Sequence, residues 1–148
     1  MTQNHFREIQ RFNQWWLWIS FLVLGVFLIY LNAVNLGALV LVVVSLIFLS
    51  LRLITNVDKA GVKFRFFPFV KKNYSWEEIE SARIVNYGFV GGWGIRLFTS
   101  YGTVYNVKGD KGLAVKLKNG KKFCLGTQRP QELQETLDLL GPPRNSAL

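Results

Sequence analysis

Six basic residues are the side chains best placed to do chemistry in this sequence, and that chemistry is the binding of an anion. They are Lys59, Lys63, Arg65, Lys71, Lys72 and Arg96. Lysine and arginine attract phosphate and carboxylate groups, and a guanidinium holds them through two parallel hydrogen bonds. We therefore predict a surface that contacts an anionic partner. The alternative is that these charges only set the topology of the chain and stay solvated.

A glycine-rich stretch, Tyr87–Phe98, raises the question of a phosphate-binding loop. Its glycines are Gly88, Gly91, Gly92 and Gly94. Neither the G-x-G-x-x-G spacing of dinucleotide-binding loops nor the G-x-x-x-x-G-K-[ST] spacing of P-loops occurs here. Both loops also place a helix N-terminus at the phosphate, whereas the residues after Gly94 favour a strand. We predict that these glycines form a structural, bulged link between two strands.

Groups for acid–base, nucleophilic or metal chemistry are sparse. The sequence has one cysteine, Cys124, and one histidine, His5, which excludes an internal disulfide and a zinc cluster. The acidic residues of the charged segment gather mainly in Glu77–Glu80 and Glu132–Asp138, which we expect on solvated surfaces. We therefore predict that the chain is not an enzyme and uses no cofactor and no metal ion.

An uncharged segment precedes the basic residues and must position them. From Trp15 to Leu51 there is no Lys, Arg, Asp or Glu. Two apolar runs, Trp15–Leu31 and Ala38–Leu51, are separated by asparagines and a glycine, which are typical of a turn. We expect a two-helix transmembrane hairpin over residues 15–53, with a single re-entrant helix as the alternative. Basic residues flank the segment on both sides, which predicts that both termini are cytoplasmic.

After Arg52 apolar and polar residues alternate, which is the pattern of half-buried antiparallel strands. The alternation is clearest at Leu113–Lys118, and the Asn119-Gly120 pair that follows favours a two-residue hairpin. We predict seven strands, at residues 55–59, 62–69, 81–87, 93–98, 103–108, 113–118 and 121–125. An amphipathic helix with a stripe of leucines follows and is predicted to stop at Gly141.

Seven antiparallel strands and one C-terminal helix are the element order of a pleckstrin-homology (PH) type fold, in which two orthogonal sheets form a barrel-like sandwich. The predicted fold is a membrane α-hairpin plus a mainly-β domain, a seven-stranded antiparallel PH-like barrel or sandwich with a C-terminal α-helix. The predicted segments are a cytoplasmic N-terminal tail (residues 1–14), the hairpin (15–53), the PH-like domain (55–141) and a C-terminal tail (142–148).

Two stretches, Tyr87–Gly109 and Leu113–Leu133, resemble the bacterial PH-like membrane proteins, which pair short transmembrane segments with a PH-like domain. The resemblance is carried by Y-G-F-V-G-G-W-G-I-R, Y-N-V-K-G and L-K-N-G-K-K-F-C-L-G-T-Q-R-P-Q-E-L. It implies a multi-pass protein of the bacterial inner (cytoplasmic) membrane, in a family whose function is poorly defined. Eukaryotic PH domains bind phosphoinositides with basic residues of their first hairpin, the place that Lys59, Lys63 and Arg65 take here.

These observations predict a membrane-anchored binding or assembly module that is integral to the lipid bilayer. One alternative is peripheral recognition of anionic lipid headgroups by the basic first hairpin. Another is a homo-oligomeric scaffold, or a contact with a different protein, in a membrane complex. Nucleic acid is disfavoured as a partner, because the sequence has neither a recognition helix nor an aromatic stacking platform among its basic residues.

Overall fold

The computed structural model describes residues 5–12, 14–32, 34–88 and 93–141, which form nine strands and three helices. In chain order these elements are β1 (Phe6–Arg11), α1 (Trp15–Tyr30), α2 (Val34–Ser50), β2 (Arg52–Asp58), β3 (Gly61–Phe67), β4 (Val70–Ser75), β5 (Ile79–Asn86), β6 (Gly94–Thr99), β7 (Gly102–Asn106), β8 (Lys111–Leu117), β9 (Lys122–Gly126) and α3 (Pro130–Leu140). The chain divides into two compact units, of which Arg11–Leu51 with its two helices is the smaller.

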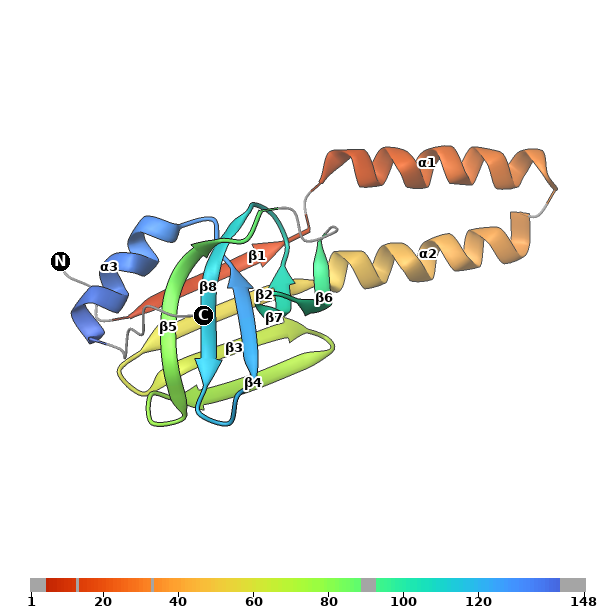
Figure 1. Cartoon of the computed structure of the whole chain (residues 1–148). Coiled ribbons are helices and arrows are strands. Elements are labelled where there is room, and N and C mark those ends of the chain that lie inside the picture. Colours follow the sequence, from red (N-terminus) through yellow and green to blue (C-terminus); the bar gives the residue numbers. More distant parts are fainter. Residues whose placement is uncertain (1–4, 13, 33, 89–92, 142–148) are drawn as a thin grey trace. The chain divides into compact units, whose positions relative to one another are not determined.

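The larger unit, which we call the β domain, contains two sheets (Figure 1). One has the strand order β1-β2-β3-β4 and the other the order β5-β8-β9-β7-β6. Phe64 of β3 packs against Tyr105 and Phe123 of the five-stranded sheet, with ring centroids 4.8 and 5.3 Å apart. These inner faces form the shared core. Because side chains alternate along a strand, the residues on either side of Phe64 in β3 point to the outer face of the four-stranded sheet.

The five-stranded sheet contains one parallel pair, β7 with β9, in which Val104 lies opposite Cys124. Its consecutive strands β5 and β6 lie at opposite edges of the sheet. Gly102 at the start of β7 has a φ of +77°, and a Cβ atom there would lie 2.1 Å from the carbonyl oxygen of Lys122. The close approach of the two backbones therefore requires glycine at this position.

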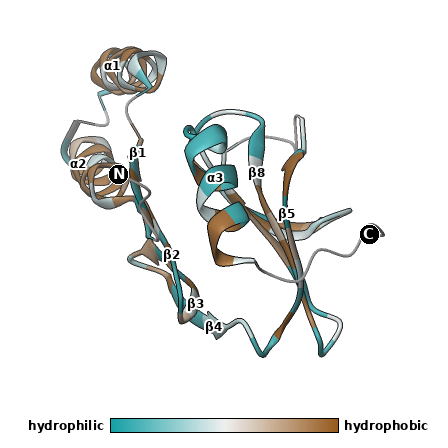
Figure 2. Ribbon diagram, turned by 90° about the vertical axis from the view of Figure 1, so that its left-hand side faces the viewer, coloured by the Kyte–Doolittle hydropathy of each residue, from teal (hydrophilic) through white to brown (hydrophobic). Residues whose placement is uncertain are grey.

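Helix α3 closes the β domain. Its residues Leu133, Thr136 and Leu137 are buried, and the helix ends at Gly141, which adopts the left-handed conformation with φ +60°. Figure 2 shows the two sheets as two diverging layers with α3 lying between them. The leucine stripe that the sequence predicts thus fills the space where the layers separate.

The smaller unit is the helix pair. Phe21 of α1 packs edge to face against Phe48 of α2, with ring centroids 5.6 Å apart. Gly37 lets the helices approach, since a Cβ atom there would lie 2.8 Å from a methyl carbon of Leu28. Many large apolar side chains of both helices remain exposed, among them Leu22 and Leu39.

No helix in the described part of the chain is long and apolar enough to cross a membrane. Helices α1 and α2 have 16 and 17 residues. At 1.5 Å per residue this gives a length of about 24–26 Å, against a hydrocarbon core of about 30 Å. The prediction of a transmembrane hairpin over residues 15–53 was therefore wrong. The multi-pass inner-membrane location, with both termini cytoplasmic, rested on that hairpin and is overturned with it.

The prediction of a seven-stranded antiparallel PH-like barrel or sandwich was also wrong, because the described residues form nine strands in sheets of four and five, and β7 pairs with β9 in parallel. The two additional strands are β1, where the sequence predicted a tail, and β4. Strand β1 buries the polar residues Glu8 and Gln10, and β4 at the edge of the sheet has no buried residue. Neither strand therefore shows the apolar alternation by which the others were found.

Candidate functional site

Three of the predicted anion-binding residues lie together on the outer face of the four-stranded sheet. Lys63 and Arg65 belong to β3 and Lys71 belongs to β4. In the antiparallel register Arg65 lies opposite Lys71, and Lys63 lies opposite Asn73. Because directly opposite residues share one face of a sheet, the three cations form one group.

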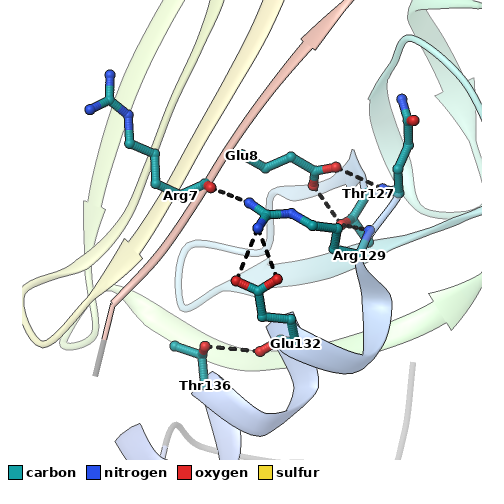
Figure 3. Close-up of polar contacts among 7 residues, drawn as sticks. Arg7, Glu8, Thr127, Arg129, Glu132 and Thr136 are labelled. Carbon is teal, nitrogen blue, oxygen red and sulfur yellow. Dashed lines mark hydrogen bonds and ion pairs between the residues drawn. The ribbon is translucent and has the colours of Figure 1, made fainter. Parts of the chain in front are cut away.

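Two arginines that flank the uncharged segment in the sequence extend this group. Arg52 is exposed on β2, opposite Phe67. Arg7 is exposed on β1 next to the buried Glu8, and Figure 3 shows the two side chains pointing in opposite directions. We call the following five residues the basic face: Arg7, Arg52, Lys63, Arg65 and Lys71.

A hollow of about 300 Å³ lies within the basic face. It is lined by Ile54, Asn56, Lys63, Phe64, Arg65, Lys71 and Asn73. The buried Oδ1 atom of Asn56 accepts no hydrogen bond from the described residues. An amide presents either its oxygen or its two N–H donors after a half turn, so Asn56 can offer donors to an anion. The hollow therefore combines cations and amide groups around one small volume.

One cation of the basic face is already paired. Lys63 Nζ lies 3.0 Å from Oδ2 of Asp58. Burial acts to raise the pKa of Asp58, but hydrogen bonds from Lys63 and from the Ala60 and Gly61 amides outweigh it and leave the pKa below its usual value. Asp58 is therefore ionised at neutral pH and neutralises much of the charge of Lys63.

Three other cations of the basic face are available to an anionic partner. Arg52, Arg65 and Lys71 are exposed, and none of them has an acidic partner within 4 Å among the described residues. The guanidinium carbon of Arg65 lies 4.9 Å from the centroid of the Phe67 ring, which supports the side chain from below. These three residues are the strongest candidates for contact with an anion.

The remaining predicted residues do not join the basic face. Lys59 lies in the turn between β2 and β3, at the end of the hairpin away from Arg52. Lys72 lies opposite Phe64 and so points to the other side of the sheet. Arg96 belongs to β6 in the five-stranded sheet, where it is half-buried. Sequence proximity therefore grouped residues that the sheet separates.

The glycine-rich link joins β5 to β6 across the width of the five-stranded sheet. Gly88 has a φ of +60°, and its amide donates a hydrogen bond to Oδ1 of Asn86 at 2.9 Å, while Gly94 has a φ of +104°. Gly91 and Gly92 lie outside the described residues. The positive φ values at both ends agree with a conformational requirement for glycine, and the structural role of the whole link stays a prediction.

Strand β6 departs from the alternation that its sequence predicts. Its register with β7 shifts between Arg96 and Thr99. Within this irregular region Phe98 has a φ of +60° and is 99% exposed, and Leu97 is also exposed. The bulge therefore turns an aromatic side chain into solvent.

A polar cluster, which the sequence did not predict, ties β1 to the start of α3 (Figure 3), and Glu8 and Thr127 are its buried members. The Glu8 carboxylate accepts hydrogen bonds from the Thr127 hydroxyl at 2.6 Å and from the Gln128 amide at 2.9 Å. The Arg129 guanidinium donates to both carboxylate oxygens of Glu132 and to the carbonyl oxygen of Arg7. These hydrogen bonds join groups of β1 to groups at the start of α3, so we assign the cluster a structural role.

Within the described residues no group of three or more His, Cys, Asp or Glu side chains could hold a metal ion. Cys124 is completely buried, and burial raises the pKa of its thiol to about 12. The thiol therefore stays protonated and inaccessible in the folded chain.

The chain matches no protein-family model, no curated protein and no solved structure. Its resemblance to the bacterial PH-like membrane proteins therefore stays a prediction. The function is therefore inferred from the geometry of the basic face.

Proposed function

We propose that this chain is a non-enzymatic binding module that holds anionic lipid headgroups on its basic face. The observation that carries the proposal is the grouping of Arg52, Arg65 and Lys71 on one exposed sheet surface, with no acid of the described residues within 4 Å of any of them. A bilayer of anionic lipids presents phosphates over a broad, flat area. An exposed sheet face with cations on several strands matches that distribution of charge.

Nucleic acid fits this surface less well than a lipid headgroup does. Proteins that bind single strands stack bases on aromatic rings that lie open on a sheet or groove. Phe67 is the aromatic residue on the outer face of β3, and the Arg65 guanidinium already lies over its ring. The outer face of β3 therefore offers charge and hydrogen-bond donors, and its aromatic ring is already covered by Arg65.

Replacing Arg52, Arg65 and Lys71 together by glutamine should weaken binding of the full chain to anionic vesicles by roughly tenfold or more. Each lysine or arginine near an anionic surface contributes about 1 kcal/mol, and 1.4 kcal/mol is a factor of ten. The measurement is co-sedimentation with phosphatidylcholine vesicles that contain phosphatidylglycerol, with pure phosphatidylcholine vesicles as the background. Binding above this background should weaken as salt rises, because charges are screened beyond about 8 Å at physiological ionic strength.

The matched control removes the same charge from exposed lysines outside the basic face, through Lys108→Gln, Lys118→Gln and Lys121→Gln. This variant should keep its preference for anionic vesicles. An equal loss in both variants would assign the effect to net charge and not to the basic face. A native chain that shows no preference for anionic vesicles at low salt contradicts the proposal. Binding to a single-stranded oligonucleotide without vesicle binding would favour nucleic acid instead.

A second candidate function, self-assembly, is favoured by the helix pair. Helices α1 and α2 are apolar around their whole circumference, and such helices are normally buried. A single facing helix could cover only one stripe of this surface. Several copies of the chain could surround it and give a shared helical core, which makes the chain a homo-oligomeric scaffold.

Self-assembly predicts that the full chain has the mass of more than one copy by sedimentation velocity. Leu22→Glu combined with Leu39→Glu should lower that mass, because a buried carboxylate without a partner opposes assembly. Leu139→Glu places the same group on an exposed position of α3 and should leave the mass unchanged. A native chain that sediments as a single copy excludes this function.

A further inference from the structure

The turn between β3 and β4 exposes apolar side chains at one end of the basic face. It runs from Phe67 to Val70, and the amide of Phe69 donates a hydrogen bond to the carbonyl oxygen of Phe66 at 2.9 Å. This hydrogen bond makes the turn tight. Pro68 is exposed and Phe69 is 62% exposed, so the tip of the turn carries a large ring in solvent.

Three cations lie next to this apolar tip. Arg65 and Lys71 lie opposite each other on the two strands that enter and leave the turn. Arg52 lies opposite Phe67 on the neighbouring strand β2. Arg52, Arg65 and Lys71, which have no acidic partner within 4 Å among the described residues, therefore lie next to the turn. Charge and exposed aromatic surface thus occur at the same end of the sheet.

This combination is suited to the boundary between lipid headgroups and acyl chains. Phenylalanine, tryptophan and leucine side chains of interfacial segments enter that boundary, where they leave water. Long basic side chains next to them extend toward the phosphates while their methylene groups cover apolar surface. A purely electrostatic contact would not need an exposed ring at the tip of the turn.

We propose that Phe69 inserts between anionic lipid headgroups while Arg52, Arg65 and Lys71 contact the surrounding phosphates. The inference rests on the proposed function, since it specifies how the basic face docks on a lipid surface. It adds a depth and an orientation: the β3–β4 turn enters the headgroup layer first. Binding then contains an apolar part that salt does not screen, beside the electrostatic part that salt does screen.

A fluorescent label at the tip tests the insertion directly. Phe69→Cys provides a single reactive thiol for an environment-sensitive nitrobenzoxadiazole label, because Cys124 is buried and protonated. On vesicles that contain phosphatidylglycerol its emission should rise and shift to shorter wavelength. The same label at Asn119→Cys, in the exposed turn between β8 and β9, should not respond. A silent label at position 69 on vesicles that the chain demonstrably binds overturns insertion and leaves the proposed function intact.

Truncation of the ring gives an independent test without a label. Phe69→Ala should weaken partition onto anionic vesicles by roughly tenfold, the loss expected when a partly buried phenyl ring is removed. It should leave the salt dependence unchanged, because the cations remain. Leu139→Ala, an exposed apolar residue on α3, is the matched control and should bind as the native chain does. Unchanged partition of Phe69→Ala overturns the inference, and absence of vesicle binding by the native chain overturns the proposed function together with it.

Discussion

Replacing Gly102 by alanine should destabilise the β domain by about 3 kcal/mol or more, a large loss for the addition of one methyl group. The added Cβ atom would lie 2.1 Å from the carbonyl oxygen of Lys122 and 2.6 Å from its carbonyl carbon. These are backbone atoms beside the parallel β7–β9 pair, in which Thr103 lies opposite Phe123. They cannot turn aside as a flexible side chain would, so the two strands must separate.

Gly120→Ala is the matched control for this effect. Gly120 also has a positive φ, +84°, but a Cβ atom there would meet no atom within 4 Å. The expected loss is about 1 kcal/mol, from backbone conformation alone. The free energy of unfolding of the β domain is measured by labelling the Cys124 thiol across a urea series, because this thiol becomes accessible when the domain opens. Equal losses in the two variants would contradict the close approach of β7 to β9.

Glu8→Ala should destabilise the β domain by about 2–4 kcal/mol, measured by the same labelling of Cys124. The Glu8 side chain is only 5% exposed as part of β1. Its removal leaves the Thr127 hydroxyl and the Gln128 amide without their acceptors at the start of α3. The variant therefore loses the tie between the first strand and the last helix.

Two further variants show whether the loss comes from this tie. Glu135→Ala removes an exposed carboxylate from α3 and should change the free energy of unfolding by no more than about 0.5 kcal/mol. Thr127→Val combined with Glu8→Ala should cost less than the sum of the two single changes, because both remove the same hydrogen bond. Strict additivity would show that Glu8 stabilises the chain in another way.

The sequence predicted the members of the basic face only in part. Lys63, Arg65 and Lys71 were predicted as one group, and the β3–β4 register places them on one face. Arg52 and Arg7 were read only as charges that flank an apolar segment, because a flanking position does not reveal which sheet a residue joins. Lys72 was included as the neighbour of Lys71, although adjacent residues of a strand point to opposite faces.

The sequence by itself determined the local elements of the β domain. The alternation at Leu113–Lys118 corresponds to β8, and a turn with a positive φ at Gly120 follows it. The predicted two-residue hairpin was wrong, because residues 118–121 lie between β8 and β9. The C-terminal helix occupies Pro130–Leu140 and stops at Gly141, where a glycine was expected to end it. Such features are readable because periodicity and turn chemistry depend on residues that are close together in the chain.

The tertiary structure alone decided which elements became neighbours. Strand β1 is recruited by contacts between residues far apart in sequence, such as Gln10 with Gly126 and Glu8 with Thr127. The parallel pairing of β7 with β9 replaces the all-antiparallel arrangement that the sequence predicted, and β5 and β6 lie at opposite edges of the five-stranded sheet. Strand pairing and the burial of polar side chains are set by partners that a local pattern does not contain.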